Sequence, residues 1–89
     1  EAALTVLTLE PGAEVPPHVH EKSVELLYVL EGEARMTLEG ETLVLRAGAA
    51  VRIPMNARHS AQVTSKGPLK AVQVYSPSGP EQRFRAPAK

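Results

Sequence analysis

Apolar and polar residues alternate with a period of two along most of the chain, which is the pattern of half-buried β-strands. Turn residues such as Gly and Pro recur about every ten residues, as they do in all-β sandwiches and barrels. No stretch carries the period of an amphipathic helix, so we expect an all-β domain of about eight strands. The strands are predicted at Leu4–Glu10, Val15–His20, Glu25–Glu31, Ala34–Glu39, Thr42–Arg46, Ala50–Ile53, Arg58–Thr64 and Leu69–Ser76.

The tetrapeptide LEGE occurs twice, at Leu30–Glu33 and Leu38–Glu41, each time between two predicted strands. Glycine adopts positive φ angles without the steric cost that other residues incur. We therefore interpret both stretches as hairpin turns, made by Gly32 and Gly40, and not as a functional repeat.

One domain is expected over residues 1–76, because a chain of 89 residues is near the lower limit for a single apolar core. A bound metal or a partner subunit would help to stabilise so small a core. From Pro77 the sequence becomes rich in proline, and residues 77–89 are interpreted as a tail in which Phe84 is a candidate anchor.

The composition excludes several kinds of site and partner. There is no cysteine, so any metal site must use imidazole and carboxylate groups. Ten Lys and Arg balance ten Glu, without the basic patch of a nucleic-acid-binding protein, and the apolar runs are too short to span a membrane. We expect a soluble, cytoplasmic protein without nucleic-acid or membrane partners. Because the chain begins at Glu1 and not at Met, the sequence leaves open whether an N-terminal segment is missing or has been removed.

Two of the three histidines lie close together in the segment PPHVHEKSVE. Side chains two apart in an extended segment point to the same side, about 7 Å from each other, so His18 and His20 can converge on one ion. Glu25 begins the next predicted strand. If that strand pairs antiparallel with the first, its inward positions are Glu25, Leu27 and Val29, and the carboxylate faces the histidines.

The third histidine, His59, also lies where a turn meets a predicted strand, on the same face as Ala61 and Val63. A single histidine on an apolar face is more often a hydrogen-bonded core residue than a metal ligand. Three histidines in such places favour a shared site. A nucleophilic pair with Ser60 is disfavoured, because adjacent strand residues face opposite ways and the chain has no Asp to orient the imidazole.

Residues 12–32 resemble the first motif of the cupin superfamily, G-x5-H-x-H-x4-E-x6-G, at every fixed position. The matching residues are Gly12, His18, His20, Glu25 and Gly32. The second motif, G-x5-P-x-G-x2-H-x3-N, is matched at three positions, namely Gly48, Pro54 and His59. Asn56 replaces its second Gly, and because Asn tolerates positive φ we expect the turn to be kept. Val63 replaces its Asn and removes a polar group from near the site.

The resemblance implies a small double-stranded β-helix, the cupin or jelly-roll barrel, with a metal site of three histidines and one glutamate in its mouth. The implied ligands are His18, His20, Glu25 and His59. One divalent ion per chain is expected, and Fe, Mn, Ni, Cu and Zn all suit imidazole and carboxylate ligands. A cupin that keeps these residues without holding a metal is the alternative. Glu21, in the turn before Glu25, should be exposed. A buried Glu21 together with an exposed Glu25 would contradict the predicted site.

A pocket over the site should be walled by inward residues of the neighbouring strands. We expect these to be Leu27, Val29, Ala34, Met36, Leu38, Ile53, Met55 and Ala61. Such a cavity is mostly apolar and suits a small ligand with one or two oxygens, and Met36 and Met55 are candidate substrate-pocket residues. Gln73 is a third candidate if its face of the last strand, shared with Tyr75, points inward and the face of Val72 points outward.

The first predicted strand is apolar on both faces, with Leu4 and Val6 on one and Leu7 and Leu9 on the other. In so small a chain, a strand buried on both sides indicates that one side contacts a partner. The resemblance to small single-domain cupins, which commonly form dimers in this way, implies a homodimer.

Three functions are compatible with these features. The first is a metal-dependent enzyme, either a dioxygenase-like oxidoreductase or an isomerase or lyase, acting on a small molecule bound in the barrel. The second is a non-catalytic binding or sensing module, and the third is a barrel whose metal adds stability. The fold does not decide among them. An apolar lining without an evident acid–base pair indicates chemistry run by the metal itself, and dioxygenase-type chemistry is the favoured reaction.

Overall fold

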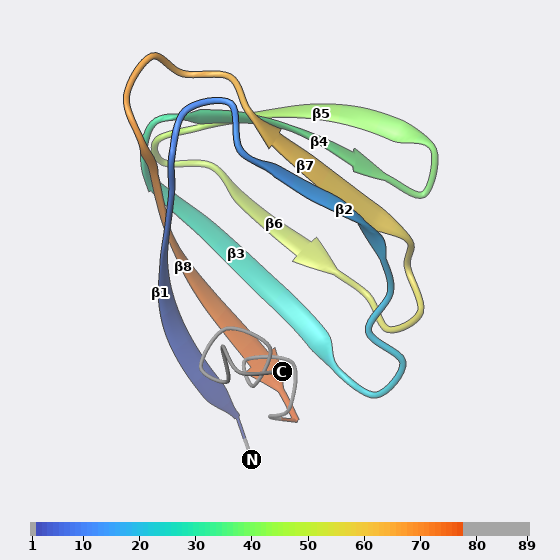
Figure 1. Cartoon of the computed structure of the whole chain (residues 1–89). Coiled ribbons are helices and arrows are strands. Elements are labelled where there is room, and N and C mark those ends of the chain that lie inside the picture. The colour runs from blue at the N-terminus through green and yellow to red at the C-terminus, as the bar shows by residue number, and fades with distance from the viewer. Residues whose placement is uncertain (1, 78–89) are drawn as a thin grey trace, which may run out of the picture.

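Two four-stranded antiparallel sheets pack against each other in the computed structural model, which describes residues 2–77 (Figure 1). One sheet has the strand order β1-β8-β3-β6 and the other has the order β2-β7-β4-β5. The strands are β1 Ala3–Leu9, β2 Glu14–His18, β3 Val24–Glu31, β4 Glu33–Leu38, β5 Glu41–Arg46, β6 Ala50–Ile53, β7 His59–Val63 and β8 Leu69–Ser76. The all-β prediction is confirmed, and β2 ends before His20.

The alternation along the strands decides which side chains enter the core between the sheets. On β3, Glu25, Leu27 and Val29 are buried, whereas Leu26 and Tyr28 are exposed. The inward phase predicted for this strand is confirmed. The buried apolar core contains Leu27, Val29, Ala34, Met36, Leu45, Ile53, Ala57, Val63, Leu69 and Ala71.

The pairing between β2 and β3, which was the condition for predicting an inward Glu25 from the sequence, does not occur. β2 pairs with β7 in one sheet, while β3 pairs with β8 and β6 in the other. The inward phase of β3 holds without this pairing because it follows from alternation within the strand, whichever strand lies beside it. Glu25 therefore faces the histidines from across the core and not from a neighbouring strand.

The two LEGE stretches make different turns. Glu39 and Gly40 have φ angles of 50° and 84° between β4 and β5, which pair with each other, so this turn is the expected hairpin. Gly32, with a φ of 89°, instead connects β3 to β4 in the opposite sheet, and the hairpin predicted there is wrong. A Cβ at Gly32 would lie 2.7 Å from the backbone oxygen of Pro68, so this crossing requires glycine.

The outward face of β1 is open to solvent. Leu4 is 68% exposed and Val6 is 63% exposed, whereas Leu7 and Leu9 are half-buried on the inward face. The described residues contain no helix long and apolar enough to cross a membrane. The predicted tail falls outside the described residues from residue 78 onward, as does Phe84.

Candidate metal centre

The three histidines converge at one end of the space between the sheets. His18 on β2 lies opposite His59 on β7 in the strand register, and their ring centroids are 4.1 Å apart. His20 follows directly after β2, with its ring 4.9 Å from that of His18 and 5.1 Å from that of His59. One nitrogen of each ring lies within 4.8 Å of the others. Their strand pairing and the loop after β2 therefore bring together residues almost forty positions apart.

Backbone carbonyls fix the tautomers of two of these rings. His18 Nδ1 donates to the carbonyl of Pro16 at 2.8 Å, and His59 Nδ1 donates to that of Ala57 at 2.9 Å. Because a carbonyl oxygen only accepts, each Nδ1 carries the proton and each Nε2 keeps its lone pair. Metal-binding histidines commonly use this arrangement. The Nε2 of His59 is buried and has no hydrogen-bond partner.

Glu25 brings a buried carboxylate to the same place from β3 in the opposite sheet. It is 3% exposed, and its Oε1 lies 3.2 Å from His20 Nε2 and 3.7 Å from His59 Nε2. Glu21 is exposed, as the sequence predicted, and Glu25 is the buried one. Burying a carboxylate is costly unless charged or hydrogen-bonding groups surround it, so the buried position of Glu25 depends on the groups around its two oxygens.

Gln73 and Tyr75 on β8 line the other side of the Glu25 carboxylate. Gln73 Nε2 donates to Glu25 Oε2 at 3.0 Å and to the hydroxyl oxygen of Tyr75 at 2.9 Å. The ring of Tyr75 also packs edge-on against His20, at a centroid distance of 5.4 Å. The inward orientation that made Gln73 a candidate is confirmed by its burial. Tyr75 was left without a role by the sequence reasoning, although it shares a strand face with Gln73.

The turn before β7 is tied to the histidine loop. Asn56 has a φ of 64°, so it keeps the left-handed turn that the second cupin motif assigns to Gly. Its backbone N–H donates to the carbonyl of His20 at 2.8 Å. Val63, which replaces the motif's Asn, is 3% exposed and pairs with Ala34 within the apolar core.

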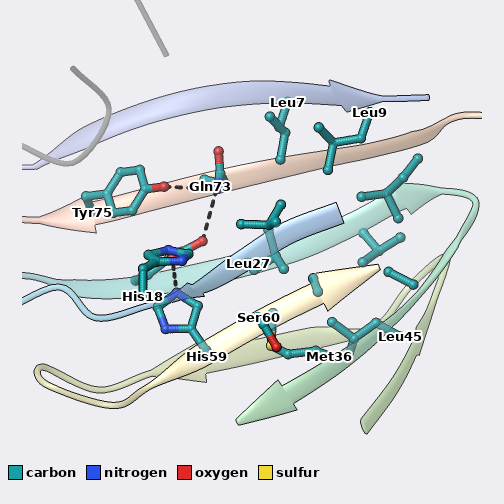
Figure 2. A pocket seen from close by; sticks show the side chains of 16 residues that line it. Leu7, Leu9, His18, Leu27, Met36, Leu45, His59, Ser60, Gln73 and Tyr75 are labelled. Carbon is teal, nitrogen blue, oxygen red and sulfur yellow. Dashed lines mark hydrogen bonds and ion pairs between the residues drawn. The ribbon is translucent and has the colours of Figure 1, made fainter. Parts of the chain in front are cut away.

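A cavity of about 60 Å³ extends from the histidines into the interior. Figure 2 shows its polar end, with His18, His59, Gln73 and Tyr75, and its apolar end, with Leu7, Leu9, Met36 and Leu45. The other lining residues are Val15, Glu25, Leu27, Val29, Ala34, Ser60, Ala61 and Leu69.

Met36 lines this cavity, as predicted, but Met55 does not. Met55 is 47% exposed, because the turn that follows β6 and Pro54 carries it away from the interior. Leu38 and Ile53 also lie outside the lining, where Leu38 is half-buried and Ile53 belongs to the packed core. These residues correct the expected cavity wall, whereas its apolar character is confirmed.

The residues that could hold a metal ion here are His18, His20, Glu25 and His59. They offer three imidazole nitrogens and a carboxylate oxygen, the donor types that suit first-row divalent ions. The fixed tautomers and the buried Nε2 of His59 without a hydrogen bond fit such an ion.

Relatives among curated proteins match most of this chain but only part of their own length. A Streptomyces cyaneus protein named polyketide synthase CurC is 34% identical over 73 residues, which cover 82% of this chain and 47% of that protein. The mannose-1-phosphate guanylyltransferase ManC of Salmonella typhimurium is 32% identical over 72 residues, which cover 81% of this chain and 15% of that protein. The chain thus spans less than half of either relative.

Solved structures share the fold. KdgF from Halomonas sp. has a TM-score of 0.83 at 27% identity, over 91% of this chain and 74% of that one. A predicted oxalate decarboxylase from Thermotoga maritima has a TM-score of 0.77 at 28% identity, over 81% and 63%. A cupin protein from Bacteroides fragilis has a TM-score of 0.75 at 28% identity, over 83% and 64%. Residues 5–75 match the sequence family described as Cupin domain. The chain therefore has the jelly-roll fold and belongs to the cupin family.

Proposed function

We propose that the chain binds one divalent transition-metal ion through His18, His20, His59 and Glu25. The observation that carries this proposal is the buried Nε2 of His59, which has no hydrogen bond and lies 3.7 Å from Glu25 Oε1. A buried polar atom without a partner is costly, and an ion between the imidazoles and the carboxylate would satisfy it. Fe, Mn, Ni, Cu and Zn all suit this set of donors.

The proposed activity is metal-dependent chemistry on a small molecule. A dioxygenase-type reaction is favoured, and isomerase-type and lyase-type reactions are the alternatives. When bound, a divalent ion with two open positions supplies Lewis-acid chemistry to a substrate oxygen. The Thermotoga maritima neighbour, described as a predicted oxalate decarboxylase, supports small-molecule chemistry in this fold. The residues that line the cavity would orient the substrate and keep water away from it.

The cavity supports an uncharged, largely apolar ligand. Among residues 2–77, no Lys or Arg lines it, and every Lys and Arg in this range is exposed. A carboxylate or phosphate group would therefore lack a cationic side chain to bind it. The apolar end accepts the hydrocarbon part of the ligand, and the polar end accepts one or two oxygens.

Non-catalytic binding or sensing is the second candidate function. Glu25 is the one carboxylate among the cavity-lining residues, and in the proposed site it is a metal ligand. Within the part of the chain that the structure describes, no second carboxylate lines the cavity to act as a general base. A site of this composition can capture a ligand without turning it over.

Elemental analysis of the purified protein tests the metal proposal. We expect about one first-row ion per chain in the wild type and loss of that ion in His59→Ala, because the variant removes one of the four donors. Gln62→Ala is the matched control, since Gln62 is exposed on the same strand and the variant should retain the ion. Unchanged metal content in His59→Ala would contradict the site.

Oxygen uptake by the iron-loaded protein separates the candidate functions. Consumption that depends on an added uncharged phenol or diketone is expected for the dioxygenase-type enzyme. A change in the spectrum of the bound metal without turnover would favour binding or sensing. If metal removal lowers only the melting temperature and no small molecule changes the spectrum, the metal has a stabilising role alone.

We also propose that the chain forms a homodimer through the outer face of the sheet β1-β8-β3-β6. In the strand register, Leu4, Val74 and Leu26 form one apolar row across this face, and Val6, Val72 and Tyr28 form the next. Leu4, Val6, Leu26 and Tyr28 are each at least 46% exposed. On β6, Arg52 continues the first row beside Leu26 and Ala50 continues the second beside Tyr28. A second copy offers the same apolar residues on β1, β8 and β3, so two such faces can pack against each other about a two-fold axis.

A further inference from the structure

The two oxygens of the Glu25 carboxylate have separate surroundings. Oε1 faces the histidines, 3.2 Å from His20 Nε2 and 3.7 Å from His59 Nε2. Oε2 accepts a hydrogen bond from Gln73 Nε2 at 3.0 Å, from the opposite side. Glu25 and Gln73 are 3% and 5% exposed, so water does not compete freely for either oxygen. The carboxylate is therefore oriented by a side chain that is not itself a candidate ligand.

Tyr75 holds the Gln73 amide in this orientation. The two N–H groups of Gln73 Nε2 serve Glu25 Oε2 and the Tyr75 hydroxyl oxygen, which is 2.9 Å away. Tyr75 is 1% exposed and packs against His20, so its hydroxyl group is fixed in place. Figure 2 shows the hydrogen bond between Gln73 and Tyr75 on the β8 side of the cavity. Two donors used at once leave the amide little freedom to rotate.

The other end of the Gln73 amide remains unpaired. Its Oε1 is buried and has no hydrogen-bond partner. Turning the amide over would place this oxygen against the Glu25 carboxylate, where two acceptors would repel each other. The chain thus leaves one carbonyl unsatisfied in order to present N–H groups to Glu25 and Tyr75. Such an arrangement lowers stability and indicates that the orientation of Glu25 matters for another reason.

We propose that Gln73 is a positioning residue that makes Glu25 offer one oxygen, Oε1, to the metal. This inference rests on the proposed metal site. An amide N–H group can neither bind a cation nor accept a proton, so it occupies Oε2 without competing for the ion. If a bound ion took six ligands, a single oxygen from Glu25 would leave two positions for substrate and a second small molecule. If both carboxylate oxygens bound, one position would remain, and substrate and a second small molecule could not bind together.

Cobalt titration of Gln73→Leu tests this role. The change removes the amide at similar volume, and Gln62→Leu is the matched control because Gln62 is exposed on β7. Co²⁺ affinity is measured by competition with a chromophoric chelator, and the visible spectrum is recorded at saturating Co²⁺. We expect the affinity of Gln73→Leu to fall by about 10- to 100-fold, as for other residues that orient metal ligands. Its Co²⁺ spectrum should also change, because Glu25 is free to rotate or to bind through both oxygens, whereas Gln62→Leu should match the wild type.

The possible outcomes separate the two proposals. A wild type that binds no Co²⁺ overturns the metal site and, with it, the role of Gln73. Wild-type affinity and spectrum in Gln73→Leu, with or without a lower melting temperature, overturn only the positioning role. If Gln73→Leu does not fold, Gln73→Asn replaces it, because the shorter side chain keeps the amide but withdraws it from Glu25. The same loss of affinity is expected for that variant, and an unchanged affinity would overturn the proposal.

Discussion

The two faces of the sheet β1-β8-β3-β6 depart in opposite ways from the usual distribution, in which folded proteins bury apolar side chains and expose polar ones. The inner face buries polar groups at one end of the core, with Glu25, Gln73 and the hydroxyl of Tyr75. The outer face exposes apolar side chains such as Leu26 and Tyr28. Buried polar groups and exposed apolar patches are both informative because folding alone does not favour them. Each departure supports one of the proposals made above, an ion bound on the inside and a second subunit bound on the outside.

Neighbouring residues of β3 show how closely these two roles are interleaved. Leu27 is 8% exposed and packs in the core, whereas Leu26 is 50% exposed on the outer face. Glu25 is buried at the proposed metal centre, whereas Glu31 is exposed near Lys70. One strand therefore supplies two pairs of identical residues in which one member is buried and the other is exposed.

The largest expected effect is on folding stability. Leu27→Ala should lower the free energy of unfolding by about 2–5 kcal/mol, because it leaves a cavity in the core. Leu26→Ala should change it by less than about 0.5 kcal/mol at protein concentrations where the chain is monomeric. Urea denaturation of the metal-free proteins measures both values. Similar losses in the free energy of unfolding of the two variants would contradict the assignment of Leu27 to the core and of Leu26 to the exposed face.

The next effect concerns metal affinity. Glu25→Gln should weaken binding by at least about 10-fold, because a neutral amide oxygen is a poorer ligand than a carboxylate. The metal-free variant should be as stable as the wild type or more stable, since a buried carboxylate is costly. Glu31→Gln makes the same change on the exposed part of β3 and should leave affinity unaltered. Isothermal titration with Zn²⁺ compares the two, and equal affinities would contradict the assignment of Glu25.

The smallest effect concerns association. Val6→Thr keeps a β-branched side chain on β1 but lowers its apolar area, so the dimer dissociation constant should rise by about 10-fold. Val44→Thr is the control, because Val44 is 51% exposed on β5 in the other sheet and should leave the dimer intact. Sedimentation over a range of concentrations measures both. A wild type that stays monomeric throughout that range would contradict the dimer proposal.

Sequence alone predicted the features that depend on local pattern. Alternation gave the strands and the inward phase of Glu25, because side-chain direction follows from the strand itself. Pairing was harder, since the partner of β2 depends on contacts far along the chain, and the true partner is β7. Met55 was misplaced because the turn after Pro54 interrupts the alternation that was extended through it.

The part of the site on β8 depended on a choice that local pattern does not make. Both faces of this strand carry apolar residues, so the inward direction of Gln73 stayed open until the packing of the sheets decided it. The contacts from Gln73 to Glu25 and Tyr75 join residues from two strands through side-chain rotamers. Such contacts leave no periodic trace in a single sequence.

The hydrogen bond from the Asn56 N–H to the His20 carbonyl has a consequence for metal selectivity. It joins the segment after β2 to the turn that leads into His59, without help from an ion. The segments that carry His20 and His59 are thus joined by the backbone itself, and an ion that binds at the proposed site would meet a framework with little freedom to adjust. Ions whose preferred bond lengths and angles differ from this framework gain less from binding than ions that match it. Discrimination among metals would then follow from backbone rigidity rather than from the chemical softness of the donors.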